Sequence, residues 1–204
     1  MTRLVVMIVS LLSVFGVVFA TPAAASETDH FQAAVDEFAR SIGMPQAVWV
    51  NIPSGKYVMT SFGPAASITS LFYDPIEEKV YIGEDALRKL TNKSHWVTPG
   101  IVRAHEWGHF LWDRAGVLRP VQASEDGADC IAGAWLAWYN QRLPQDLRIG
   151  LADMPGLASL LGMISRNERS PEGDIHGTFQ DRSLAMINGF LHGIGSCDHY
   201  KQFV

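Results

Sequence analysis

The sequence predicts an α+β domain in which a small β-sheet lies before a largely helical half. Short segments rich in β-branched and aromatic residues lie between residues 46 and 83, separated by turn residues. From Thr98 onward, apolar residues recur at helical spacing instead. Because strands and helices are segregated along the chain, we expect separate layers rather than alternating βαβ units.

Local start and stop signals place each expected element. A first helix over residues 29–43 has Asp29 as its cap and Gly43 at its end. The expected strands are "QAVWVNI", "KYVMTSF" after the turn "PSGK", "SITSLFY", and "KVYIG" after the turn "DPIEE". A short helix over 84–91 comes next, followed by helices over 98–116, 123–140, 154–166 and 178–191. The helix over 98–116 has Thr98 as N-cap, Pro99 as first helical residue and Gly116 as stop.

The first residues resemble a secretion signal. Arg3 supplies a positive charge, an apolar run follows over residues 4–20, and Ala23-Ala24-Ala25 offers the small residues of a cleavage site. Residues 1–25 would then be a signal peptide and residues 26–204 a single domain. An uncleaved anchor is the alternative, because the run reaches the low end of spanning length. In both cases we expect the domain outside the cytoplasm, either secreted or periplasmic.

Composition excludes some partners. The chain has 204 residues, enough for one domain with a real core, and a formal net charge of −5 without a lysine and arginine cluster. Nucleic acid is therefore not an expected partner, since binding phosphates requires a basic face. We expect no membrane contact beyond the signal segment, and the sequence does not indicate an oligomeric state.

The chain has two cysteines, Cys130 and Cys197. An oxidising compartment would allow them to pair. Two unpaired, buried thiols are the alternative that their spacing leaves open.

The segment "AHEWGH" predicts a metal site on the helix over 98–116. His105 and His109 are four residues apart, so both imidazoles lie on one helix face and can bind one cation. Glu106 lies about 100° round the helix and is free to act on a water molecule at the metal. Gly108 weakens the helix by about 1 kcal/mol but leaves space beside the two histidines.

The next helix offers the further ligand that zinc requires. Glu125 and Asp129 are also four residues apart, so Glu125 can bind the metal while Asp129 accepts a hydrogen bond from a ligating histidine. The small residues Ala128, Ala132 and Gly133 would let the two helices approach closely. The alternative is structural, because acidic residues are common near helix starts.

Three segments resemble the bacterial neutral zinc metallopeptidase family: "AHEWGH", "EDGADCIAGAW" and "HGTFQDRSLAMINGFLHGIGSCD". The resemblance implies a zincin-like fold with one zinc ion per chain and an edge strand, within "FYDPIEEKVYIG", that pairs with extended substrate. It implies these site residues: zinc ligands His105, His109 and Glu125, general base Glu106, orienting acid Asp129, and a disulfide between Cys130 and Cys197.

Together these observations predict an exported zinc metallopeptidase that hydrolyses peptide bonds in peptide or protein substrates. A zinc-activated water would attack the carbonyl with Glu106 as general base, and His176 and Arg182 are candidate oxyanion donors. A salt-bridging Arg182 and a structural His176 at a helix start are the alternatives. A zincin-like domain that binds a peptide or protein without turnover, a hydrolase of non-peptide amides, and a metal-free module stapled by a disulfide are the alternative functions.

Overall fold

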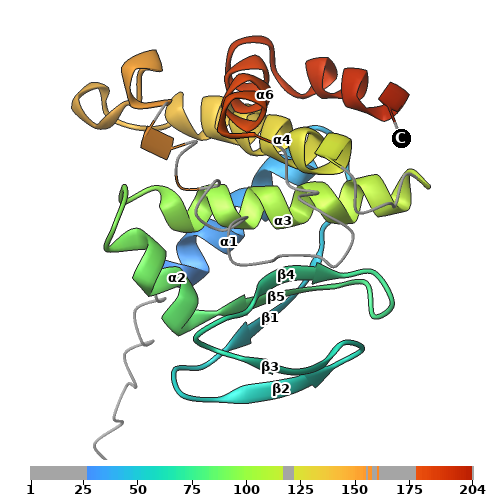
Figure 1. Ribbon diagram of the computed structural model, residues 1–204. Coiled ribbons are helices and arrows are strands. Elements are labelled where there is room, and N and C mark those ends of the chain that lie inside the picture. Colours follow the sequence, from blue (N-terminus) through green and yellow to red (C-terminus); the bar gives the residue numbers. More distant parts are fainter. Residues whose placement is uncertain (1–26, 117–121, 155, 158–159, 161–177, 204) are drawn as a thin grey trace, which may run out of the picture.

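The computed structural model describes residues 27–116, 122–154, 156–157, 160 and 178–203 (Figure 1). The chain is a mixed α+β protein with a small sheet and a larger helical part, as the sequence predicts. The predicted signal segment and most of the predicted helix over 154–166 lie outside the described residues.

The main sheet has three strands in the order β1-β5-β4. These are β1 (Val48–Ile52), β4 (Leu71–Asp74) and β5 (Lys79–Gly83). Strand β1 runs parallel to β5, with Trp49 opposite Val80, whereas β4 runs antiparallel to β5, with Tyr73 opposite Val80. The predicted turn over 74–78 therefore joins a hairpin, and β4 is an edge strand of this sheet.

A separate hairpin consists of β2 (Tyr57–Thr60) and β3 (Gly63–Ala66). Strand β3 was not predicted, and the expected strand over 67–73 begins only at Leu71. Residues 67–70 turn instead, because Ser67 bonds to Asp85 through its hydroxyl and the Thr69 N–H donates to the Ala66 carbonyl.

Helix α3 is the central element of the helical part (Figure 1). It lies between the sheet on one side and helices α4 and α6 on the other. The helices are α1 (Glu27–Ser41), α2 (Glu84–Thr91), α3 (Thr98–Arg114), α4 (Gln122–Asn140) and α6 (Phe179–His192). Three 3₁₀ segments are η1 (Gln145–Leu147), η2 (Leu151–Asp153) and η3 (Ile194–Phe203).

The ends of α3 agree with their sequence signals to within one residue. Val97, not Thr98, is the N-cap, so Thr98 and Pro99 are the first two helical residues. Gly116 follows the helix with φ of +74°, a backbone conformation that glycine adopts without strain. Asp29 lies inside α1, which already includes Glu27, so it does not cap that helix.

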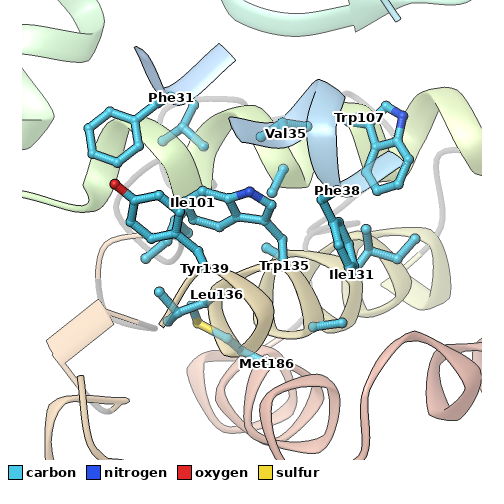
Figure 2. Packing of buried hydrophobic residues seen from close by; sticks show 14 of the residues in the cluster. Phe31, Val35, Phe38, Ile101, Trp107, Ile131, Trp135, Leu136, Tyr139 and Met186 are labelled. Atoms are coloured by element: carbon cyan, nitrogen blue, oxygen red, sulfur yellow. The ribbon is translucent and has the colours of Figure 1, made fainter. Parts of the chain in front are cut away.

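The hydrophobic core lies where α1, α3 and α4 meet (Figure 2). Phe31 and Phe38 of α1 pack against tryptophans of α4 and α3, and Trp135 stacks on Tyr139. Trp107 is fully buried, and its Nε1–H donates to the Pro45 carbonyl at 2.9 Å. Trp112 and Trp135 are buried as well, whereas Trp138 of α4 is only partly buried against this core.

A disulfide joins Cys130 of α4 to Cys197 of η3, with 5.5 Å between the two Cα atoms. This confirms the predicted pairing and fastens the C-terminal 3₁₀ segment onto α4. Among the described residues, we find no helix with the length and apolar character to cross a membrane.

Candidate metal centre

Helices α3 and α4 cross at Gly108. A Cβ atom at position 108 would lie 2.8 Å from Ala128 Cα, closer than real Cβ contacts. The absence of a side chain there lets the two backbones meet beside His105 and His109, as predicted. Gly133 has a different function from the predicted one, because it packs against Met186 of α6 and not against α3.

Three side chains converge at this crossing. His105 and His109 from α3 and Glu125 from α4 each offer a ligand atom, and these atoms lie within 4.8 Å of one another. The two histidine Nε2 atoms are 3.1 Å apart. The Glu125 oxygens lie 3.5 Å from His105 Nε2 and 3.4 Å from His109 Nε2. Ligand atoms at about 2.0–2.1 Å from a tetrahedral zinc are about 3.3 Å apart, so this group could hold a metal ion.

Asp129 lies behind His105. Its Oδ1 is 2.8 Å from His105 Nδ1, and the carboxylate is fully buried. A carboxylate at Nδ1 keeps the proton on that nitrogen and turns the Nε2 lone pair toward the other ligand atoms. This is the contact that the spacing of Glu125 and Asp129 predicts.

The acids affect the two histidines differently. Burial alone would lower the pKa of His105, but the charge of Asp129 and hydrogen bonds with Asp129 and Glu125 outweigh burial and raise this pKa to about 10. Burial lowers the pKa of His109 to about 4, against the attraction of Glu125. A metal ion requires the unprotonated imidazole, so a raised pKa at His105 means that a metal ion would compete with a proton there.

The other predicted site residues have different surroundings. Glu106 is buried on α3 beside His105 and is not one of the three convergent ligands. Arg182 is also buried, and its Nε and Nη2 donate to Asp129 at 2.6 and 3.0 Å. The structure thus shows the salt-bridging arginine, while its proposed function as an oxyanion donor stays a prediction. His176 lies outside the described residues.

Two tyrosines of the main sheet donate hydrogen bonds to carboxylates. Tyr73 of β4 donates to Asp113 at 2.5 Å, and Tyr81 of β5 donates to Glu77 at 2.8 Å. Both tyrosine side chains are buried.

Asp126 is a buried acid to which the sequence did not point. It is 9% exposed, and its Oδ1 accepts no hydrogen bond from the described residues. Burial raises the pKa of Asp126 to about 6, and the negative charges of Asp129 and Asp181 act in the same direction. The sequence signal for Asp126 is that three acids, Glu125, Asp126 and Asp129, lie within five residues. This is more negative charge at the start of α4 than one metal ligand requires.

Comparison with curated proteins finds uncharacterized relatives. The chain is similar to proteins of Mycobacterium tuberculosis and Mycobacterium bovis, with 31% identity over 104 residues. The alignment covers 44% of this chain and 35% of each relative, so the chain spans about a third of the length of the relatives it matches. No protein-family model and no solved structure matches the chain. The resemblance to zinc metallopeptidases therefore stays a prediction.

Proposed function

We propose that this protein is an exported zinc metallopeptidase with a zincin-like fold. The observation that carries the proposal is the convergence of His105, His109 and Glu125, with separations of 3.1 to 3.5 Å between their ligand atoms. Two imidazoles and one carboxylate form a ligand set typical of catalytic zinc sites, which leave a fourth position open. The disulfide supports an oxidising compartment, in agreement with export.

In this proposal each residue of the site has one task. Bound zinc would polarise the scissile carbonyl and lower the pKa of a water molecule. Glu106 takes a proton from the attacking water and returns it to the leaving amine. It can do so because it follows a ligand directly in sequence but points about 100° away from that ligand round the helix. Asp129 holds His105 in the tautomer that binds the metal through Nε2.

The proposed substrate is a peptide or protein in extended conformation. Strand β4 is an edge strand of the main sheet, and it packs against α3, the helix that carries both histidines. An edge strand has unpaired backbone groups that an extended peptide can bind. This arrangement favours peptide bonds over other amides as the substrate.

Metal content is the first test. Elemental analysis of the purified protein should find one zinc per chain, and Glu125→Ala should lose it. Glu37→Ala, which removes an exposed carboxylate on α1, is the matched control and should keep the metal. Folded protein without zinc after reconstitution at neutral pH would disprove the proposed metal centre and favour a metal-free structural module.

Turnover is the second test, because a zincin-like domain could bind peptides without cleaving them. A library of peptides should be cleaved by the zinc-loaded protein and not by the Glu125→Ala variant. If peptides bind but no cleavage products appear, the result would contradict the enzyme and favour a peptide-binding domain. Release of product from a non-peptide amide alone would change the substrate class.

A further inference from the structure

Arg182 connects α6 to the metal centre. Its side chain is 2% exposed, and its guanidinium lies against Asp129 and Glu125 of α4. We propose that Arg182 is a positioning residue of the metal centre, which orients the acid behind one ligand and holds a second ligand in place. The proposal rests on the metal-binding function proposed above.

The contact with Asp129 has the geometry of an orienting clamp. Nε donates to one carboxylate oxygen at 2.6 Å and Nη2 donates to the other at 3.0 Å. Two parallel hydrogen bonds from a planar guanidinium fix the plane of a carboxylate, which a single charge does not. The Oδ1 atom held in this way is also the atom that lies 2.8 Å from His105 Nδ1. The orientation of the His105 ring therefore depends on Arg182 through Asp129.

The same guanidinium also contacts a candidate ligand. Arg182 Nη2 lies 3.5 Å from Glu125 Oε2, and this oxygen is itself 3.5 Å from His105 Nε2. One arginine thus contacts a ligand and the acid that orients another ligand. Its positive charge offsets acids that are buried at this end of α4, where uncompensated carboxylates would be costly.

The burial of Arg182 favours a positioning function over direct contact with the substrate. The guanidinium is enclosed between α4 and α6, and its Nε and Nη2 point at Asp129. A side chain that is 2% exposed offers almost no surface to a substrate carbonyl. We therefore expect loss of Arg182 to change metal binding first, and turnover only as a consequence.

The docking of α6 makes this position rigid. A Cβ at Gly189 would lie 1.8 Å from the Cys130 carbonyl oxygen, so the backbones of α4 and α6 touch. At the start of α6, Thr178 caps the helix by accepting the Asp181 N–H at 3.2 Å, next to Arg182. Both contacts fix the position of Arg182 along the axis of α4.

The test measures the affinity of the whole protein for Zn²⁺ alone, by competition with a chromophoric chelator, and the visible spectrum of the Co²⁺ form. Arg182→Met should weaken zinc binding about 10- to 100-fold, the usual effect of losing an outer partner of a metal ligand. Arg182→Lys keeps the charge without the two parallel bonds, and should fall between wild type and Arg182→Met. Arg142→Met, in the exposed turn that follows α4, is the control and should bind zinc like wild type.

A double-mutant cycle distinguishes positioning from a general loss of structure. If Arg182 acts through Asp129, Arg182→Met should weaken binding less in an Asp129→Asn chain than in the parent chain. If Arg182→Met alone does not fold, Arg182→Lys takes its place in the cycle, because it keeps the buried positive charge. Circular dichroism reports folding, and a shifted Co²⁺ spectrum in folded Arg182→Lys reports a changed ligand geometry.

The outcomes separate the two proposals. Wild type could bind zinc while folded Arg182→Met or Arg182→Lys shows the same affinity and the same Co²⁺ spectrum as wild type. This result would overturn the positioning function and leave the metal centre intact. If the factors by which Arg182→Met and Asp129→Asn weaken zinc binding simply multiply in the double variant, Arg182 does not act through Asp129. A wild-type protein that binds neither ion would overturn the metal centre and the positioning function with it.

Discussion

Gly108 lies directly against Ala128, and this contact sets the distance between the two helices that carry the candidate metal ligands. A Cβ at position 108 would be 2.8 Å from Ala128 Cα and 3.1 Å from its Cβ. The nearest obstacle is backbone, so a larger residue cannot be accommodated by turning a side chain. Histidines from α3 can reach a carboxylate from α4 because the helices are this close.

Gly108→Ala should therefore weaken metal binding as well as stability. Overpacking costs about 1–3 kcal/mol, against a gain in helix propensity of about 1 kcal/mol, so we expect a net loss in urea unfolding. Because the helices must separate, zinc affinity should fall as well. The control is Gly100→Ala on the same helix, where the obstacles are the Trp135 and Phe31 rings and not the α4 backbone beside the ligands. Equal zinc affinities in both folded variants would contradict a specific function of the Gly108 contact.

Glu106→Gln should separate metal binding from catalysis. The substitution keeps the size of the side chain and does not replace one of the three candidate ligands, so zinc content should stay at one per chain. Loss of a general base costs about 100- to 10,000-fold in rate, and peptide hydrolysis should fall by that factor. Glu37→Gln on α1 is the exposed control. Undiminished hydrolysis by Glu106→Gln would assign the base to another group.

Most of the metal centre could be predicted because its signals are local. His105 and His109 are one helical turn apart, and Pro99 and Gly116 mark the ends of the helix that carries them. Glu125 and Asp129 repeat the same spacing on the next helix. Each of these relations depends on a few neighbouring residues and on helix geometry alone.

The sequence allowed a salt-bridging Arg182 but could not identify Asp129 as its partner, because this contact is a long-range relation. The arginine is 53 residues from Asp129, and a buried ion pair between two helices has no pattern in the local sequence. A weaker signal existed, since Arg182 lies on the same helix face as the buried residues Ala185, Met186 and Gly189. An arginine on a buried face requires an acidic partner.

Strand β3 was missed for a different physical reason. Gly63 and Pro64 begin it, and both residues normally argue against a strand. The hairpin forms because Thr60 and Gly63 pair at its turn and because Ala65 packs on Ile52 and Tyr81. Tertiary packing overrides local propensity at this point.

Removal of the disulfide should destabilise the protein strongly. Cys130 and Cys197 are 67 residues apart, and closing a loop of that length stabilises by about 4 kcal/mol on the chain-entropy estimate. The Cys130→Ala/Cys197→Ala variant should therefore unfold at much lower urea concentration. Wild type with a reducing agent is the matched comparison. A change below about 1 kcal/mol would show that the helical contacts of α4 and η3 suffice without the bond.

Asp74 should make stability depend on pH through the contact between the hairpin and the main sheet. Its buried carboxylate, at the end of β4, accepts the Ser61 N–H at 3.1 Å and the N–H groups of Ile76 and Glu77 at 2.9 and 3.1 Å. Burial alone would raise the pKa of Asp74, but the hydrogen bonds from Ser61, Glu77 and Ile76 outweigh it and lower this pKa.

A lowered pKa means that the ionised carboxylate stabilises the folded chain above the ordinary aspartate pKa, and that this stabilisation is lost as pH falls below it. Asp74→Asn should therefore lower the free energy of unfolding by about 1–3 kcal/mol near pH 7. The difference from wild type should shrink as pH falls below about 4, because the carboxyl of the unfolded chain then takes up a proton while folded Asp74 stays ionised to lower pH. Urea unfolding of both chains from pH 7 to pH 3 measures this difference, and the exposed Asp146→Asn is the control. A difference that stays constant over the whole range would show that the charge of Asp74 contributes nothing, and that its hydrogen bonds alone hold the hairpin to the sheet.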